Sequence, residues 1–99
     1  MESSVLDKNQ FDGQVAVVTG AAQGIGFAIA ERLHKAGATV WILDIDEAAA
    51  KDAAGRLGER AHGHGTDVTD EASVLAARDA VLSGSGRVDV LANNAGVYP

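Results

Sequence analysis

A glycine-rich turn near the start of the chain has the composition of a phosphate-binding loop. It follows a β-branched run and precedes a helical pattern, and it reads Gly20, Ala21, Ala22, Gln23, Gly24, Ile25, Gly26. Glycine adopts positive φ and lets the backbone approach a ligand closely. A helix that starts in such a turn points unpaired N–H groups at a phosphate. The turn therefore predicts a pyrophosphate site, although a plain strand–helix turn packed by glycines would have the same composition.

An acidic residue follows the next apolar run. Asp44 comes 18 residues after Gly26, directly behind the run 39–43. A carboxylate in this place can accept hydrogen bonds from both ribose hydroxyls of adenosine. It would repel a 2′-phosphate, and neither Gln23 nor Ile45 supplies a compensating cation. We expect NAD in preference to NADP; the alternative is an Asp that merely precedes the next helix.

A third polar segment follows the run 60–66, where Asp67 is joined to Val68. Ligands of open α/β sheets bind outside the carboxyl ends of the strands. At such an end the Asp67 carboxylate can meet an adenine amino group while Val68 packs on the ring. An Asp before a turn is common, so this pair is a weak signal by itself.

The fourth segment follows the run 88–92 and consists of Asn93, Asn94, Ala95 and Gly96. Two adjacent Asn amides can tie neighbouring strands together through backbone hydrogen bonds. Ala and Gly leave room for a cofactor ribose. A structural turn without ligand contact competes strongly as an explanation of Asn93 and less strongly of Asn94.

The elements that position these segments alternate along the chain. We expect strands at 14–19, 39–43, 60–66 and 88–92, and helices at 24–36, at 46–57 and after Asp70, with a flexible break at 83–86. The alternation predicts an α/β fold with a parallel sheet covered by helices on both faces. Apolar stripes should bury the helices, through Ile25, Ile29 and Leu33 in the first and Val74, Ala77 and Val81 in the third.

The handedness of the connections predicts where each helix lies. The first three strands step in one direction, so the two helices between them share one face of the sheet. The third connection crosses back to place the fourth strand beside the first, and its helix therefore lies on the opposite face.

Composition excludes several classes of function. A formal net charge of −6 disfavours binding to a nucleic acid, and the absence of Cys rules out disulfides and thiolate zinc sites. The sequence contains no run of about 18 apolar residues, so it predicts no membrane span. Residues 1–10 are mostly polar and do not resemble a signal peptide, so we expect a cytoplasmic protein. The pair His62 and His64 has no third ligand candidate, and we expect no metal site.

The four segments, in this order, resemble the N-terminal half of the short-chain dehydrogenase/reductase family, in its large classical-type group. Residues 19–26 match the family's TGxxxGxG turn, and residues 93–96 match its NNAG motif. The similarity extends over about residues 11–97. One departure is Ser85 before Gly86, where members often carry an aromatic residue.

The resemblance implies the first half of a Rossmann-type αβα sandwich and an oxidoreductase that acts on alcohols or carbonyls with NAD(P). The parent enzyme would be a homo-dimer or homo-tetramer. For the pyrophosphate the resemblance implies Gly20, Gln23, Gly24, Ile25 and Gly26. It implies Asp44 for the adenosine ribose, and Asp67 and Val68 for the adenine. For the nicotinamide-side ribose it implies Asn94, Ala95 and Gly96.

The family's proton-transfer group is a Tyr with a Lys four residues later and a Ser upstream. A phenol with a pKa near about 10 must be brought toward neutral pH to exchange a proton efficiently. The one Tyr of this sequence, Tyr98, is followed only by Pro99. We therefore expect no catalytic residues within the chain and no activity from the 99 residues alone.

The domain interpretation follows from these motifs. We expect an N-terminal extension at 1–10 and, at 11–99, the NAD-binding Rossmann half-domain of an NAD-dependent dehydrogenase whose catalytic half is absent. Two alternatives remain open: a non-catalytic module that binds an adenine dinucleotide, and a non-functional gene fragment.

Overall fold

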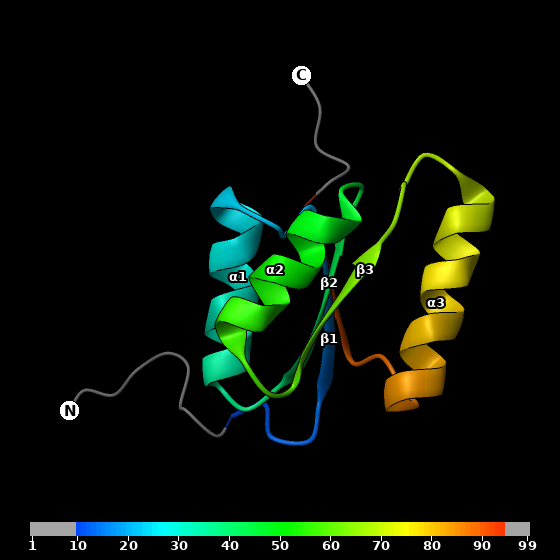
Figure 1. Ribbon diagram of the computed structural model, residues 1–99. Coiled ribbons are helices and arrows are strands. Elements are labelled where there is room, and N and C mark those ends of the chain that lie inside the picture. The colour runs from blue at the N-terminus through cyan, green and yellow to red at the C-terminus, as the bar shows by residue number, and fades with distance from the viewer. Residues whose placement is uncertain (1–9, 95–99) are drawn as a thin grey trace.

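The computed structural model describes residues 10–94, which form a four-stranded sheet with three helices (Figure 1). The elements are, in order, β1 (Val15–Thr19), α1 (Gly24–Lys35), β2 (Thr39–Asp44), α2 (Glu47–Leu57), β3 (Ala61–Gly65), α3 (Glu71–Ser85) and β4 (Val90–Asn93). Within this part of the chain, no helix combines the length and apolarity that crossing a membrane requires.

All strand pairs are parallel, and the strand order is β3-β2-β1-β4. Val17 of β1 pairs with Trp41 of β2 on one side and with Leu91 of β4 on the other. Helices α1 and α2 cover one face of the sheet, and α3 lies on the opposite face (Figure 1). The predicted α/β Rossmann-type architecture, including the crossover to β4, is confirmed.

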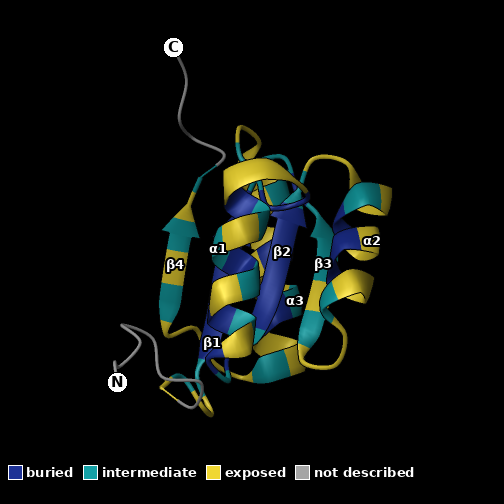
Figure 2. Cartoon of the chain, turned by 90° about the vertical axis from the view of Figure 1, so that its left-hand side faces the viewer, coloured by how far each residue is buried: buried dark blue, intermediate teal, exposed yellow. Residues whose placement is uncertain are grey.

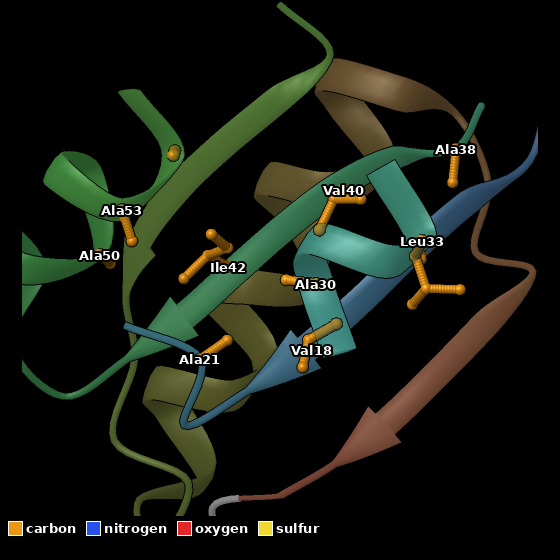
Figure 3. Close-up of a cluster of buried hydrophobic side chains, with 11 residues drawn as sticks. Val18, Ala21, Ala30, Leu33, Ala38, Val40, Ile42, Ala50 and Ala53 are labelled. Atoms are coloured by element: carbon orange, nitrogen blue, oxygen red, sulfur yellow. The ribbon is translucent and has the colours of Figure 1, made fainter. Parts of the chain in front are cut away.

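The main core lies between the sheet and the pair α1 and α2. Both central strands are buried, and β2 forms a dark stripe through the middle of Figure 2. Val18, Val40 and Ile42 point from the strands toward small residues such as Ala30 and Ala50 of the helices (Figure 3). Alanine at these positions lets the helices approach the sheet closely, so the β-branched strand residues pack directly against them.

The face that α1 buries differs from the predicted stripe. Leu33 is buried and Ile29 is half-buried, but the side chain of Ile25 is 75% exposed. Gly26 and Ala30 are the other buried residues of the helix. The first turn of α1 is held by the close approach of Gly26 to the preceding turn, which rotates Ile25 away from the sheet.

The end of α3 is helical where the sequence predicts a flexible break. The indole Nε1 of Trp41 donates to Oγ of Ser85 at 2.8 Å. A Cβ on Gly84 would lie 2.7 Å from Cζ2 of Trp41, so the indole packs directly on the helix backbone. The helix ends only at Gly86, which adopts a left-handed conformation with φ +80°. The expected break at 83–86 is therefore wrong.

The apolar face of α3 is also narrower than predicted. Ala77 and Val81 are buried against the sheet, whereas Val74 is 41% exposed. Val15 and Val17 of β1 and the β2 side chains in the same cluster contact the middle and end of the helix.

Strand β4 begins two residues later than predicted because its entry is fixed by a side chain. The N–H of Asp89 donates to the carbonyl of Val15 at 2.8 Å, and the N–H of Val15 donates to Oδ2 of Asp89 at the same distance. Arg87 pairs with Oδ1 of Asp89 at 2.6 Å. The carboxylate therefore links the beginning of β1 to the segment that leads into β4.

Candidate functional site

The carboxyl ends of β1, β2 and β3 enclose a hollow of about 310 Å³. It is lined by Gly20, Leu43, Asp44, Ile45, Thr66, Asp67, Val68 and Thr69. Four residues that the sequence assigns to cofactor binding thus meet at one place, although they come from the ends of three different strands. This edge of the sheet is where ligands of open parallel sheets bind.

Asp44, the last residue of β2, has both carboxylate oxygens held by backbone amides. Oδ2 accepts from the N–H of Ala22 at 3.2 Å, and Oδ1 accepts from the N–H of Asp46 at 3.1 Å. The turn is itself joined to β2, because the N–H of Gly20 donates to the carbonyl of Leu43 at 2.8 Å. The carboxylate is therefore fixed in orientation at the wall of the hollow.

The glycine-rich turn leaves the beginning of α1 open. Gly20 and Gly24 have φ +62° and +65°, a left-handed conformation that favours glycine. Gln23 precedes the helix with an extended backbone and gives no side-chain cap, and the first turn of α1 contains no acidic residue. The N–H groups at this helix start can donate hydrogen bonds to an anionic ligand.

Gly26 and Asn94 pack the turn from behind. A Cβ on Gly26 would lie 2.9 Å from both Cα of Ala21 and Nδ2 of Asn94, and it would overlap the carbonyl oxygen of Gly20. Nδ2 of Asn94 donates to that same carbonyl at 3.2 Å. Asn94 thereby links the end of β4 to the turn.

The neighbouring Asn93 makes a different contact. Its Oδ1 accepts from Oγ1 of Thr19 at 2.9 Å, which joins the ends of β4 and β1. Both Asn side chains therefore bind groups of the adjacent strand and its turn. Two further residues that the sequence assigns to cofactor binding, Ala95 and Gly96, lie outside the described residues.

Asp67 carries a negative charge at the hollow. Its Oδ1 accepts from the hydroxyl and the N–H of Thr69, at 2.6 and 2.9 Å. These hydrogen bonds, that of the hydroxyl foremost, hold the pKa of Asp67 below its ordinary value. Its own N–H donates to Oγ of Ser73 at 2.9 Å, so the loop after β3 is anchored to α3.

Five of the described residues that the sequence assigns to cofactor binding do not line this hollow: Gly26 and Asn94, which pack the turn, and Gln23, Gly24 and Ile25. Gln23 and Gly24 lie at the open start of α1, beside it in the chain. Ile25 belongs instead to an apolar hollow on the outer surface of α1, together with Ile29 and Leu33. Within the turn, Gly20 therefore lines the hollow, whereas Gln23 and Gly24 form the start of α1.

Some residues at the site have little or no signal in the sequence. Thr66 and Thr69 flank the predicted pair Asp67 and Val68, and their place after a strand could have indicated them. Arg56 lies on α2, yet its Nη2 donates to the carbonyl of Ala22 at 3.4 Å. No local pattern indicates this contact, because it depends on how α2 packs against the turn.

The two His residues of β3, which the sequence raised as a possible metal pair, each contact a side chain of the protein. The ring of His62 lies 4.6 Å from that of Trp41, measured between centroids, and Nδ1 of His64 lies 3.2 Å from Oγ1 of Thr66. Between residues 10 and 94, no three His, Cys, Asp or Glu side chains are grouped as a metal site requires.

Comparison with known proteins agrees with this geometry. The family model described as short chain dehydrogenase matches residues 14–99. D-threitol dehydrogenase of Mycolicibacterium smegmatis is 48% identical over 99 residues, which cover 97% of this chain and 38% of the relative. The 3-oxoacyl-[acyl-carrier-protein] reductase FabG of Salmonella typhimurium is 42% identical over 87 residues, 88% of this chain and 36% of the relative.

A solved structure extends the likeness to three dimensions. The 3-ketoacyl-(acyl-carrier-protein) reductase of Brucella melitensis, crystallised in complex with NADH, superposes with a TM-score of 0.80 at 44% identity. The match covers 82% of this chain and 33% of that protein. The chain spans little more than a third of the length of these curated relatives. With 86 consecutive residues matched by the family model, it belongs to the short-chain dehydrogenase family.

Proposed function

We propose that the chain is the cofactor-binding part of an oxidoreductase that transfers a hydride between an alcohol or carbonyl substrate and a nicotinamide dinucleotide. The observation that carries the proposal is the meeting of Gly20, Asp44 and Asp67 at one hollow beside the open start of α1. The names of the relatives, which are dehydrogenases and reductases, and the NADH complex of the structural neighbour support the same function.

Each group of site residues binds a different part of the dinucleotide in this proposal. The turn, through Gly20, Gln23, Gly24, Ile25 and Gly26, supplies N–H groups and space for the pyrophosphate. The Asp44 carboxylate accepts hydrogen bonds from the hydroxyls of the adenosine ribose. Asp67 accepts from the adenine amino group, and Val68 packs on the adenine ring. Asn94, Ala95 and Gly96 are assigned to the nicotinamide-side ribose. In this proposal residues 11–99 are the cofactor-binding half-domain and residues 1–10 an extension.

NAD is the preferred cofactor in this proposal. A 2′-phosphate next to Asp44 would meet a fixed negative charge, and none of the described residues that line the hollow is Lys or Arg. Two charges about 4 Å apart repel by roughly 1 kcal/mol in water and about 4 kcal/mol near a protein surface. The resulting preference for NADH over NADPH is about fivefold or more.

Calorimetric titration of the chain tests the proposal. NADH and ADP-ribose should both bind, because the turn, Asp44 and Asp67 contact the adenine half of the cofactor. Adenosine, which lacks the pyrophosphate, should bind much more weakly. A chain that binds none of these ligands contradicts the proposal.

Proton transfer is not expected from these residues. The family's Tyr followed by Lys four residues later does not occur within positions 1–99. General acid–base help contributes roughly 10²–10⁴-fold to a rate, so residues 1–99 alone should give no steady NADH production from an alcohol. Turnover above that of a heat-denatured sample would contradict this part of the proposal.

A further inference from the structure

Arg56 reaches from α2 to the glycine-rich turn. Its Nη2 donates to the carbonyl oxygen of Ala22 at 3.4 Å. Its Cζ lies 4.5 Å from the centre of the Phe27 ring of α1, within the range of a cation–π contact. Its Nε pairs with Asp52, one helical turn earlier, at 3.6 Å. The guanidinium is thus held by groups from both helices and the turn.

Ala22 connects Arg56 with Asp44. The carbonyl of Ala22 accepts from Arg56, and the N–H of the same residue donates to Oδ2 of Asp44. Ala22 is buried, and its side chain has no polar group that could replace either bond. A shift of this backbone segment therefore moves a donor that orients the Asp44 carboxylate.

The ordinary role of an exposed Arg does not account for this arrangement. The pair with Asp52 is an exposed ion pair within one helix, and such pairs contribute little. The contacts with Phe27 and Ala22 instead direct the side chain to the turn that holds Asp44. A carboxylate that receives two ribose hydroxyls works only in a fixed orientation, which supporting groups must maintain.

We propose that Arg56 is a positioning residue of the cofactor site, which fixes Ala22 and through it the carboxylate of Asp44. The cofactor part of this inference rests on the proposed function, whereas the effect on the turn does not.

Replacement of Arg56 tests the proposal by NADH titration. The Arg56→Ala variant should bind NADH about three- to tenfold more weakly, the effect of losing one charge-assisted hydrogen bond that is partly exposed. The Arg56→Lys variant, which keeps a cationic donor, should regain most of the affinity. Arg78→Ala is the matched control, because Arg78 is an exposed, ion-paired residue of α3 and its loss changes the net charge equally.

A double-mutant cycle separates positioning from direct contact. In an Asp44→Ala background, which removes the oxygen that accepts from Ala22, Arg56→Ala should cause no further loss of NADH affinity, because its effect passes through the Asp44 side chain. Losses that simply add would overturn the proposal and would mean that Arg56 acts on the cofactor independently.

Amide hydrogen exchange tests the turn without any ligand. The N–H of Ala22 should exchange faster in Arg56→Ala than in the unmodified chain or in Arg78→Ala. If the unmodified chain fails to bind NADH, the proposed function is wrong, and this exchange rate still decides the role of Arg56. If Arg56→Ala does not fold, Phe27→Leu removes the ring beneath the guanidinium and should also accelerate the exchange. Equal exchange at Ala22 in all folded variants would overturn the proposal.

Discussion

Asp44 combines a structural role with the proposed recognition of ribose, and substitution can separate the two. The Asp44→Asn variant keeps an oxygen that accepts from the N–H of Ala22 but removes the charge. We expect it to bind NADPH nearly as well as NADH, and Asp44→Arg to prefer NADPH, because the repulsion of a 2′-phosphate is lost or reversed. Titration of each variant with both cofactors measures the ratio.

The control for this test is Asp79→Asn, which removes an exposed acid on α3 and should leave the ratio of affinities unchanged. Equal affinity of the unmodified protein for NADH and NADPH would mean that Asp44 does not face the ribose.

Gly26 and Gly55 offer a matched pair for the packing of the turn. A Cβ at Gly26 would overlap the Gly20 carbonyl, and backbone cannot move aside as a flexible side chain can. We expect Gly26→Ala to destabilise the chain by about 1–3 kcal/mol. A Cβ at Gly55, within α2, meets no atom within 4 Å, so Gly55→Ala should stabilise by up to about 1 kcal/mol. Urea denaturation measures both, and equal effects would contradict this account.

At the level of single residues, the sequence predicts part of the site. Asp44 and Asp67 can be found because each directly follows a predicted strand, an apolar one for Asp44 and a weaker one interrupted by His and Gly for Asp67, and parallel strands bring such positions to one edge. Arg56 cannot be found in this way. Its contact with Ala22 joins residues 34 positions apart and depends on the packing of α2, which no local pattern encodes.

Among the elements, α3 depends on its last turn for attachment to the sheet. The buried indole of Trp41 has its N–H satisfied by Oγ of Ser85. The Ser85→Ala variant should be destabilised by about 1–3 kcal/mol, because it leaves a buried donor without a partner. The emission of Trp41, the one Trp of the sequence, should shift as well. Ser83→Ala, at an exposed position of the same helix, is the control, and an equal loss in both variants would contradict the assignment.

The entry to β4 makes stability depend on pH. The hydrogen bond with Arg87, and then that with the N–H of Val15, hold the pKa of Asp89 below its ordinary value. A depressed pKa in the folded state stabilises the fold above the pKa of the unfolded state, and this contribution is lost as the pH falls through the folded value. Urea midpoints should therefore fall in acid, and less steeply in Asp89→Asn. An unchanged slope in that variant would contradict the role of the carboxylate.

The elements themselves are largely predictable, and the errors have physical causes. Apolar runs and helical patterns locate six of the seven elements, because burial imposes the periods of strand and helix, and the alternation of the elements locates β3, which reads AHGHG. The segment 83–86 is rich in Ser and Gly, a composition typical of loops, but contact with Trp41 keeps it helical. The exposure of Ile25 likewise follows from the packing of Gly26 on the turn, which helical periodicity cannot reveal.

In the whole molecule, the two faces of the sheet are covered unequally. Among the described residues, α1 and α2 cover one face, whereas α3 is the one helix on the other (Figure 1). Beside α3, a second hollow of about 360 Å³ is lined largely by apolar residues, among them Val17, Val88 and Leu91. Leu91 is 65% exposed on β4, an edge strand of the sheet formed by the described residues.

This exposed surface predicts that a protein of residues 1–99 associates with itself. An edge strand offers unpaired N–H and C=O groups to another strand, and the neighbouring apolar hollow adds a hydrophobic driving force. Leaving a few hundred Å² of apolar surface uncovered forgoes on the order of 5–10 kcal/mol at ~25 cal/mol per Å², comparable with the stability of a whole domain. We therefore expect marginal stability, binding of hydrophobic dyes and concentration-dependent sedimentation in analytical ultracentrifugation. Leu91→Lys, which places a charge on the edge strand, should reduce the association, since charged edge residues oppose strand pairing. A monomer that melts cooperatively above about 60 °C would contradict this prediction.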